Sequence, residues 1–506
     1  MRKIILMLLI FAFIFVSGCN LKNNTPITIK ITSTPSNAMV YVDGSFKGET
    51  PLSIDNISKG NHRVVVEKAN YLAVRDNIKV EKEDTFNFNL VPPPLFFEGD
   101  YSNIYDTVIE QNKLYIVNIA LKEANVYCID LGQKKEIWKY KIEGINNISN
   151  FKVIDNIIYI SIYDEKHRYY VLYTIDGERQ LLNKETFPAV TGGKIGEDIV
   201  INYSFDFFNP AALDNFITAY SLKQHKIIWE KDIKEKEPIV VLGPFNNYVC
   251  AFGISNSYLK IFKIDKTTGE TILQKVFPEI SNFGAGESEK IIPSPIGNIG
   301  KKIFFAPDER EIYCVDLDRM EILYKCDPGI YFHLAAIKDN LLFVSGSGKS
   351  VAIDINSGKI KGTFDVQFSA INSAISARKV SAISTVNGKV FIGVSGDKIH
   401  SFDKNGKELP FPYSPDMLGG SFSDFETSNN ILLVSATNRI TGEPINYLYA
   451  FDTETFEPLF IIRGEDGDQE LSFRIYSDLL FIISRNIGGP RHGKDKVMII
   501  DLKVFK

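Results

Sequence analysis

Short stretches in which apolar and polar residues alternate recur along almost the whole chain from residue 27 onward. A period of two is typical of β-strands with one buried and one exposed face. Near the N-terminus it predicts strands over Ile27–Ile31, Met39–Val42, Arg63–Val66 and Asn77–Val80. Asp43-Gly44 directly follows one of these strands and predicts a tight hairpin turn, because glycine accepts a positive φ without steric cost.

The remainder of the chain, residues 95–506, repeats a strand that ends in a polar anchor residue, with a mean spacing of about 46 residues. Nine copies align on this anchor, at Asp130, Asp176, Ser221, Asp265, Asp316, Asp354, Asp403, Asp452 and Asp501. This period is typical of a four-stranded β-propeller blade. Because the aspartates recur at turns around the ring, we expect them to cap turns and not to catalyse a reaction.

Five copies carry an aromatic residue eight positions after the anchor, on the next predicted strand: Trp138, Trp229, Tyr324, Phe411 and Phe460. Only Lys503–Lys506 follow the last anchor, which is too little for an outer strand. We therefore expect Leu95-Phe96-Phe97 to supply that strand and to close the ring. The predicted fold is all-β, a small β-sandwich followed by a propeller of eight or nine four-stranded blades.

The first residues have the pattern of an export signal. Arg2 and Lys3 precede the apolar run Ile4–Val16, which is too short for a spanning helix, and Ser17-Gly18-Cys19 follows. This resembles the lipobox of bacterial lipoproteins, which implies that residues 1–18 are a signal peptide and that the acylated thiol of Cys19 anchors the mature chain to the membrane. The alternative is an ordinary secretory signal with a chance cysteine. In the lipoprotein interpretation, residues 19–26 are the lipidated cysteine and a short linker on the extracytoplasmic side.

The small module resembles the PEGA domain. The resemblance lies in Thr34–Gly44, Gly48–Leu52, Lys59–His62 and Asn70-Tyr71. Asn37 and Asn70 stand where that family has glycine, and asparagine tolerates a left-handed backbone better than most residues. The resemblance gives a β-sandwich over residues 27–91 and no catalytic residue, and Asp43 is interpreted as a turn former. Pro92-Pro93-Pro94 is a stiff spacer that marks the domain boundary.

The pattern Tyr-Ala-Phe-Asp followed by an aromatic residue resembles the quinoprotein-type propeller built from pyrroloquinoline quinone repeats. That family's enzymes imply a vicinal cysteine pair and a catalytic aspartate beside the cofactor. No two cysteines are adjacent in this chain. We therefore expect no catalytic residue, no metal and no cofactor, while a degenerate quinoprotein dehydrogenase remains the alternative.

The charge of the chain bears on its partners, and the positions of its cysteines bear on disulfide formation. The formal charge is −5 and the 57 basic residues form no block that would neutralise phosphates, so nucleic acid is excluded as a partner. Cys128 and Cys314 stand where other copies carry small residues, which predicts buried thiols. Cys314 and Cys326 lie on either side of one predicted turn, and the sequence leaves open whether they form a disulfide or are two buried thiols.

The function predicted from these features is that of a membrane-tethered extracytoplasmic lipoprotein. Its propeller is expected to act as a non-catalytic scaffold that binds an envelope protein or a cell-wall polymer, with the lipid bilayer as a further partner through Cys19. The sequence identifies neither the partner nor the membrane, nor the face of the propeller that binds.

Overall fold

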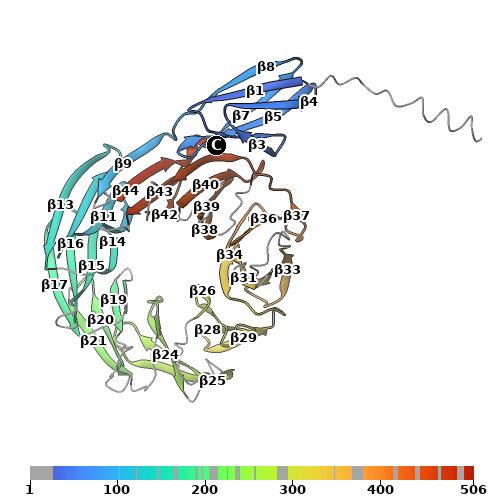
Figure 1. The fold of residues 1–506 in the computed structure, drawn as a ribbon. Coiled ribbons are helices and arrows are strands. Elements are labelled where there is room, and N and C mark those ends of the chain that lie inside the picture. The colour runs from blue at the N-terminus through green and yellow to red at the C-terminus, as the bar shows by residue number, and fades with distance from the viewer. Residues whose placement is uncertain are drawn as a thin grey trace, which may run out of the picture. The chain divides into compact units, whose positions relative to one another are not determined.

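A computed structural model shows that the regular secondary structure of the described chain is almost entirely β-strand (Figure 1), as the predicted all-β class requires. The residues described are 27–505 without 102, 121, 145–147, 165–168, 189–191, 196–197, 204–214, 225, 234–239, 256–257, 282–294, 347, 367–379, 414–419, 439–444, 465–468 and 487–494. Within these ranges no helix is long and apolar enough to cross a membrane. The predicted signal peptide and Cys19 lie outside the described residues.

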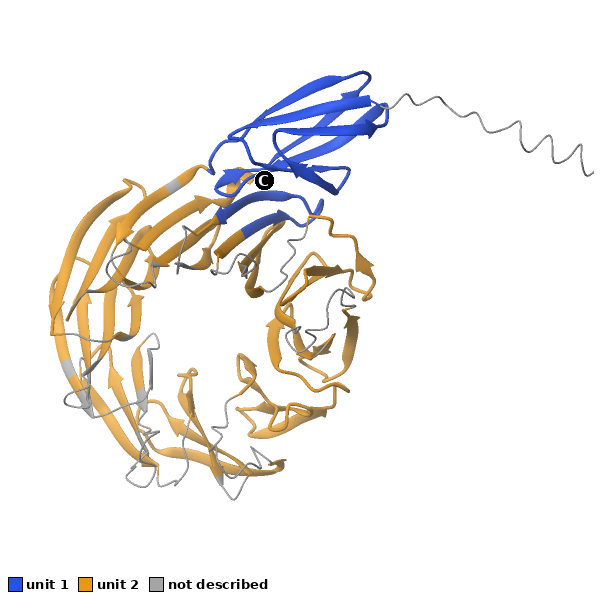
Figure 2. Cartoon of the chain, viewed as in Figure 1, with its two compact units in different colours: residues 1–93, 449–462 blue, residues 94–448, 463–506 orange. Residues whose placement is uncertain are grey.

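The chain divides into two compact units (Figure 2). Unit 1 comprises residues 1–93 and 449–462, and unit 2 comprises residues 94–448 and 463–506.

The N-terminal part of unit 1 is a sandwich of two sheets. One sheet has the order β4-β1-β8 and the other β3-β2-β5-β7. The strands are β1 (Ile27–Thr34), β2 (Met39–Val42), β3 (Ser45–Glu49), β4 (Leu52–Ile57), β5 (Gly60–Glu67), β7 (Val74–Val80) and β8 (Asp84–Asn89). Alternate residues such as Ile29 and Ile31 of β1 and Val64 and Val66 of β5 are fully buried in one core between the sheets. The four strands expected in this region are confirmed, whereas β3, β4 and β8 were not predicted from the sequence.

Residues with a positive φ stand at the turns of the sandwich. Asp43 and Gly44 have φ values of 50° and 76° and join β2 to β3 in an antiparallel hairpin, which confirms the predicted tight turn. Asn37 and Asn70 have φ values of 59° and 68°, in the left-handed region that the glycines of the PEGA pattern favour. The two asparagines therefore adopt the left-handed backbone conformation that glycine would adopt at these turns.

Unit 1 also contains the segment 449–462, which carries the end of β40 (Ile445–Asp452) and most of β41 (Pro458–Arg463). The two-residue strand β6 (Tyr71–Leu72) pairs antiparallel with β41. The amide of Ala73 donates to the carbonyl of Leu459 at 2.9 Å. The Arg63 guanidinium binds both carboxylate oxygens of Glu457 at 2.8 Å each. A charge-assisted bidentate pair and a strand ladder therefore hold this segment inside the unit.

Unit 2 consists mainly of four-stranded antiparallel sheets that follow one another in chain order. Blades 1 to 4 are formed by β10 (Ile104–Glu110), β11 (Lys113–Ala120), β12 (Glu123–Asp130) and β13 (Lys135–Glu143); β14 (Ile148–Ile154), β15 (Ile157–Asp164), β16 (Tyr169–Asp176) and β17 (Leu181–Pro188); β18 (Gly192–Ile195), β19 (Ile199–Tyr203), β20 (Asn215–Ser221) and β21 (Lys226–Ile233); and β22 (Val240–Leu242), β23 (Tyr248–Ser255), β24 (Tyr258–Asp265) and β25 (Thr271–Ser281).

Blades 5 to 7 are formed by β26 (Gly297–Ile299), β27 (Lys302–Phe305), β28 (Ile312–Asp316) and β29 (Glu321–Cys326); β30 (Leu334–Lys338), β31 (Leu341–Gly346), β32 (Lys349–Asp354) and β33 (Ile360–Asp365); and β34 (Val380–Val386), β35 (Lys389–Val394), β36 (Ile399–Phe402) and β37 (Glu408–Leu409). The eighth repeat contributes β38 (Ser421–Ser428), β39 (Ile431–Asn438), β40 and β41. The ninth has β42 (Gln469–Tyr476), β43 (Leu479–Asn486) and β44 (Asp495–Asp501), which the short 3₁₀ helix η3 (Leu502–Phe505) follows.

The outer strand of the ninth blade comes from the other end of unit 2. β9 (Leu95–Tyr101) pairs antiparallel with β44, with Phe97 opposite Ile499. This confirms the predicted closing strand. The described chain therefore has nine four-stranded repeats, which decides between the eight and nine blades that the sequence left open.

Neighbouring blades of unit 2 pack face to face through apolar side chains. Ile116 of blade 1 and Phe481 of blade 9 share one buried cluster, as do Tyr115 of blade 1 and Ile160 of blade 2. Similar clusters join blades 2 to 7 in sequence. Each strand in the middle of a blade turns one face to the preceding blade and the other to the following blade, so both of its faces are buried. Such strands therefore carry near-continuous apolar runs in place of a strict alternation.

Candidate functional site

The predicted anchor residues stand at the end of the third strand of each repeat, where the chain turns. The anchors Asp130, Asp176, Asp265, Asp316, Asp354, Asp403, Asp452 and Asp501 each accept a hydrogen bond through Oδ1 from a backbone amide two to four residues later. In the third repeat Ser221 replaces the aspartate, and its hydroxyl accepts from the Gln224 amide at 3.1 Å. The repeated carboxylates are thus engaged in Asx turns.

These hydrogen bonds favour the ionised carboxylate. The Thr268 and Thr267 amides hold the pKa of Asp265 below its usual value. The Ser357 hydroxyl and amide do the same for the pKa of Asp354, and the Lys407 amide for the pKa of Asp403. A carboxylate that is stabilised in its charged form by a turn is poorly suited to take up a proton in catalysis.

Three of the five predicted aromatic residues link one blade to the turn of the next. The indole Nε1 of Trp138 donates to the Gly177 carbonyl at 2.8 Å, and Nε1 of Trp229 donates to the Lys266 carbonyl at 2.8 Å. The Tyr324 hydroxyl donates to the Ile355 carbonyl at 3.0 Å. The structure thus places these side chains between blades.

The other two aromatic residues lie elsewhere. Phe460 is fully buried on β41, opposite Leu72 of β6 in unit 1. Phe411 lies beyond the end of β37, and its ring packs edge-on against Phe391 with 6.1 Å between centroids.

The four described cysteines are all free and buried. Cys314 stands opposite Tyr324 in the ladder, and Cys326 stands opposite Ile312. The two thiols therefore do not face each other, and of the two possibilities left open the structure has two buried thiols. Burial raises the pKa of both Cys128 and Cys314 to about 11, so these thiols are protonated and unreactive near neutral pH.

An Asp-His-Ser arrangement in unit 1 is structural. His62 lies with Nδ1 2.7 Å from Asp43 Oδ2, and its Nε2 is 2.9 Å from the Ser58 carbonyl but 3.4 Å from the Ser58 hydroxyl. Burial lowers the pKa of His62, but the hydrogen bonds to Asp43 and to the Ser58 carbonyl outweigh it, and the pKa is raised. Two acceptors suit an imidazolium that donates from both nitrogens, which fastens β5 to two turns and leaves no base for the serine.

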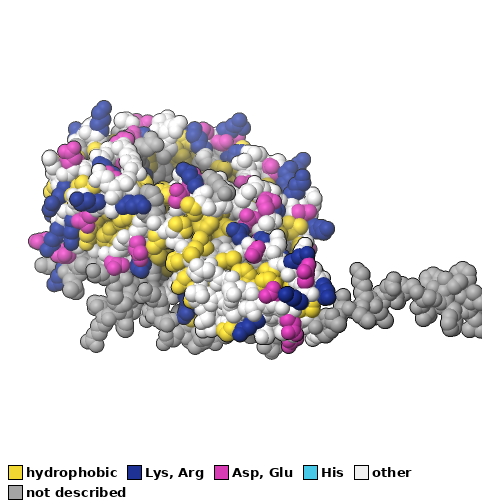
Figure 3. All heavy atoms as spheres, turned by 90° about the horizontal axis from the view of Figure 1, so that it is seen from above, with side chains coloured by type: hydrophobic (Ala, Val, Ile, Leu, Met, Phe, Trp, Pro, Cys, Tyr) yellow, Lys and Arg dark blue, Asp and Glu magenta, His cyan; other side chains and the backbone are white. Residues whose placement is uncertain are grey.

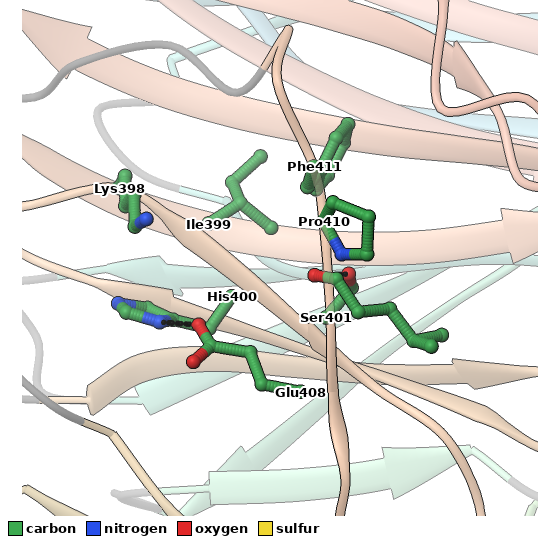
Figure 4. Close-up of a pocket in the computed structure, with 8 residues that line it drawn as sticks. Lys398, Ile399, His400, Ser401, Glu408, Pro410 and Phe411 are labelled. Atoms are coloured by element: carbon green, nitrogen blue, oxygen red, sulfur yellow. Dashed lines mark hydrogen bonds and ion pairs between the residues drawn. The ribbon is translucent and has the colours of Figure 1, made fainter. Parts of the chain in front are cut away.

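The strongest candidate for a ligand site is a hollow of about 290 Å³ in blade 7, lined by Lys398, Ile399, His400, Ser401, Glu408, Leu409, Pro410 and Phe411 (Figure 4). The hollow exists because the outer strand stops early. β37 has only two residues, whereas the fourth strands of the other blades have six to eleven. Pro410 ends the strand because it has no backbone N–H to continue the ladder.

A buried histidine forms the floor of this hollow. The His400 side chain is about 1% exposed, with Nδ1 2.8 Å from Glu408 Oε1 and Nε2 3.4 Å from Asp397 Oδ2. Figure 4 shows Glu408 turned toward the imidazole, with Pro410 and Phe411 farther along the same segment of chain. The Ser401 hydroxyl donates to the Leu409 carbonyl at 3.0 Å. Both imidazole nitrogens are thus held by carboxylates, and the hydroxyl of Ser401 has its own acceptor.

Blade 7 lacks a contact between a lysine and a tyrosine ring that blades 1, 2 and 5 make. His400 lies three residues before its anchor, where blades 1, 2 and 5 have Tyr127, Tyr173 and Tyr313. There a lysine of the outer strand lies over each ring, at 5.1, 5.1 and 5.4 Å from the centroids. In blade 7 the outer strand β37 ends before the position opposite His400. The site was not predicted from the sequence, although the histidine within the repeat and the Pro410-Phe411-Pro412 run signal it.

A second feature is a band of exposed aliphatic side chains, here called the outer-strand band. It lies on the fourth strands of blades 1 to 4, where Ile137, Leu181, Leu182, Ile227, Ile272, Leu273 and Val276 are 37–51% exposed. On the face that Figure 3 shows, apolar side chains are interspersed with basic and acidic ones, without a field of one charge. Among the described residues no group of three or more histidine, cysteine, aspartate or glutamate side chains is arranged to hold a metal ion.

Comparison with protein families places a PEGA domain at residues 27–94. The search of curated proteins gives no match. Similar solved structures include BamB from Moraxella catarrhalis (12% identity, 65% of this chain and 92% of that chain, TM-score 0.41), Sqt1 from Saccharomyces cerevisiae (11%, 70% and 94%, 0.42) and the computationally designed Ika8 protein (14%, 67% and 96%, 0.41). At this level of likeness the propeller assignment rests on the nine repeats themselves.

Proposed function

We propose that the protein is a lipid-tethered, extracytoplasmic binding scaffold without catalytic activity, whose propeller recruits an envelope protein through the outer-strand band. The PEGA domain supports the compartment, since such domains occur in extracytoplasmic proteins. The turn-capping role of the repeated carboxylates supports a binding role over a catalytic one.

The observation that carries the proposal is the outer-strand band. Ile272, Leu273 and Val276 of β25 and Leu181 and Leu182 of β17 lie on the outermost strands of their blades. Edge strands of monomeric proteins are normally protected by charges or coverings, because an exposed apolar edge promotes association. Exposed aliphatic residues on four successive outer strands are typical of a surface that a protein partner covers.

Capture experiments with outer-strand variants test the proposal. The full chain is purified from solubilised source membranes as the wild type, as Leu182→Lys/Ile272→Lys, and as the control Ile360→Lys, whose residue is 48% exposed on β33 outside the band. We expect mass spectrometry to identify a partner that the wild type and the control retain and that the double variant loses at least tenfold. Equal retention by all three proteins, each with an unchanged thermal midpoint, would contradict the proposed surface.

A further inference from the structure

The hollow of blade 7 differs from the rest of the ring in three ways at once. Its outer strand is truncated at Pro410, its repeat position carries His400 where no other repeat has a histidine, and two carboxylates hold that histidine. In a repeat protein, a place where several local rules are broken together indicates a functional position.

We propose that this hollow binds a ring of a neutral, hydroxyl-rich saccharide, such as one unit of a cell-surface polymer. This inference deepens the proposed scaffold function, on which it rests for the location of the protein, but it concerns a surface separate from the outer-strand band.

The mixed charge of the lining favours a neutral ligand over a strongly charged one. The exposed charged groups of the lining are one cation, Lys398, and one anion, Glu408. Asp397, the other partner of His400, is buried. A phosphorylated or polyanionic ligand would meet the Glu408 carboxylate, and a polycation would meet the Lys398 ammonium group. Hydroxyl groups both donate and accept, and therefore suit a lining that offers one ammonium donor and one carboxylate acceptor.

The Glu408 carboxylate is held in place for such a contact. Its Oε1 atom is 2.8 Å from His400 Nδ1, while its side chain is 45% exposed. The imidazole is in turn fixed by Asp397 and by the ring of Phe402, which stacks on it with 6.4 Å between centroids. A carboxylate positioned in this way accepts a hydrogen bond at little cost in side-chain entropy.

The opposite side of the hollow is apolar. Pro410 and Phe411 follow β37, and Phe411 is held by its edge-on contact with Phe391. A sugar ring has apolar C–H faces and hydroxyl groups around its edge, so an aromatic ring on one side and a carboxylate on the other match its two kinds of surface. A few placed polar groups beside an apolar wall are typical of small-ligand sites.

Saturation-transfer NMR with the full chain tests the inference, with chitotriose and cellotriose as neutral probes and a lysine-rich peptide as a charged one. The variants are Glu408→Gln, which keeps the shape but removes the charge, and Phe411→Leu, which keeps an apolar side chain but removes the ring. Glu321→Gln is the matched control, because this exposed glutamate also begins the outer strand of its blade.

We expect at least one trisaccharide to bind the wild type and Glu321→Gln equally, and Glu408→Gln and Phe411→Leu at least tenfold more weakly. Equal binding by every variant would place the saccharide elsewhere and overturn the inference, as would binding of the peptide alone or of no probe. Leu182→Lys/Ile272→Lys separates the two proposals. If this variant loses the protein partner and still binds the saccharide, both the outer-strand band and the saccharide site are supported. If Glu408→Gln loses the saccharide and keeps the protein partner, the saccharide site acts independently of the outer-strand band.

Discussion

At the scale of single residues, the linkage between blades depends on glycines that leave room for an aromatic ring. Gly358 has a φ of 69°, and a Cβ atom there would lie 2.4 Å from Tyr324 Cδ2. Gly269 stands in the same relation to Trp229, with a distance of 2.6 Å. A positive φ and a close approach thus coincide at the turn that receives the aromatic side chain.

Gly358→Ala is expected to destabilise unit 2 through both effects. The left-handed backbone costs about 1 kcal/mol with a Cβ atom, and the overlap with Tyr324 adds about 1–3 kcal/mol. Gly300→Ala is the control, because Gly300 has a φ of 53° and a Cβ atom there would meet no other atom within 4 Å. Urea unfolding of the full chain should give a clearly larger loss for Gly358→Ala, and equal losses would contradict the proposed packing role of the glycine.

Glu67 gives unit 1 a pH-dependent stability. This carboxyl is 4% exposed and is hydrogen-bonded to the Tyr41 hydroxyl at 3.0 Å. Burial outweighs that hydrogen bond and raises the pKa of Glu67 from 4.5 to about 7. The folded state therefore binds the proton more tightly than the unfolded chain does, and the stability is highest below pH 4.5 and falls as the pH rises to about 7.

Glu67→Gln should remove this dependence. Relative to the wild type, the free energy of unfolding of the variant should rise between pH 4.5 and about 7, to a difference of roughly 3 kcal/mol. Hydrogen exchange of β2 and β5 amides at several pH values measures it. Glu49→Gln, an exposed position in the same sheet, should show no such trend; a parallel trend in both variants would refute the assignment to Glu67.

At the scale of elements, the sequence predicts strands well where the alternation is local. The turn at Asp43-Gly44 and the third strand of each repeat are marked by their own residues, and β9 was expected because the last repeat lacks an outer strand. The pairing of β6 with β41 was not predicted, since a two-residue strand gains its partner from a segment almost 400 residues away. The hollow was missed for a similar reason, because it depends on where β37 stops.

The segment 449–462 of unit 1 tests how far such a non-local contact stabilises an element. Glu457 is buried and both its carboxylate oxygens are bound by Arg63, so Arg63→Ala leaves a buried charge without its partner. We expect a loss of about 3–5 kcal/mol in Arg63→Ala and a smaller loss in Arg63→Ala/Glu457→Gln.

Exchange protection of the Ala73 amide, which donates to the Leu459 carbonyl, measures the effect of these substitutions. Lys79→Ala, which removes an exposed ion pair with Glu81, is the control and should change little. If the double variant lost as much protection as the single one, the buried charge would not be the cause.

At the scale of the whole molecule, the predicted lipid anchor can be tested at Cys19. Cys19→Ser should remove the acylation site, so that the chain is recovered in the soluble extracytoplasmic fraction, whereas Cys250→Ser, at a buried thiol, should leave it with the membrane. Fractionation with mass spectrometry of the N-terminal peptide measures both. Membrane retention of Cys19→Ser without a lipid mass would contradict the lipoprotein prediction.

The strand that closes the ring also sets an order of events during folding. β9 begins at Leu95 and its partner β44 ends at Asp501, so this ladder joins the two ends of the propeller sequence. The earlier blades need only local hairpins, whereas the last sheet pairs segments about 400 residues apart, and bringing such distant segments together is slow. Until β43 and β44 have folded against it, the first blade therefore has one apolar face uncovered.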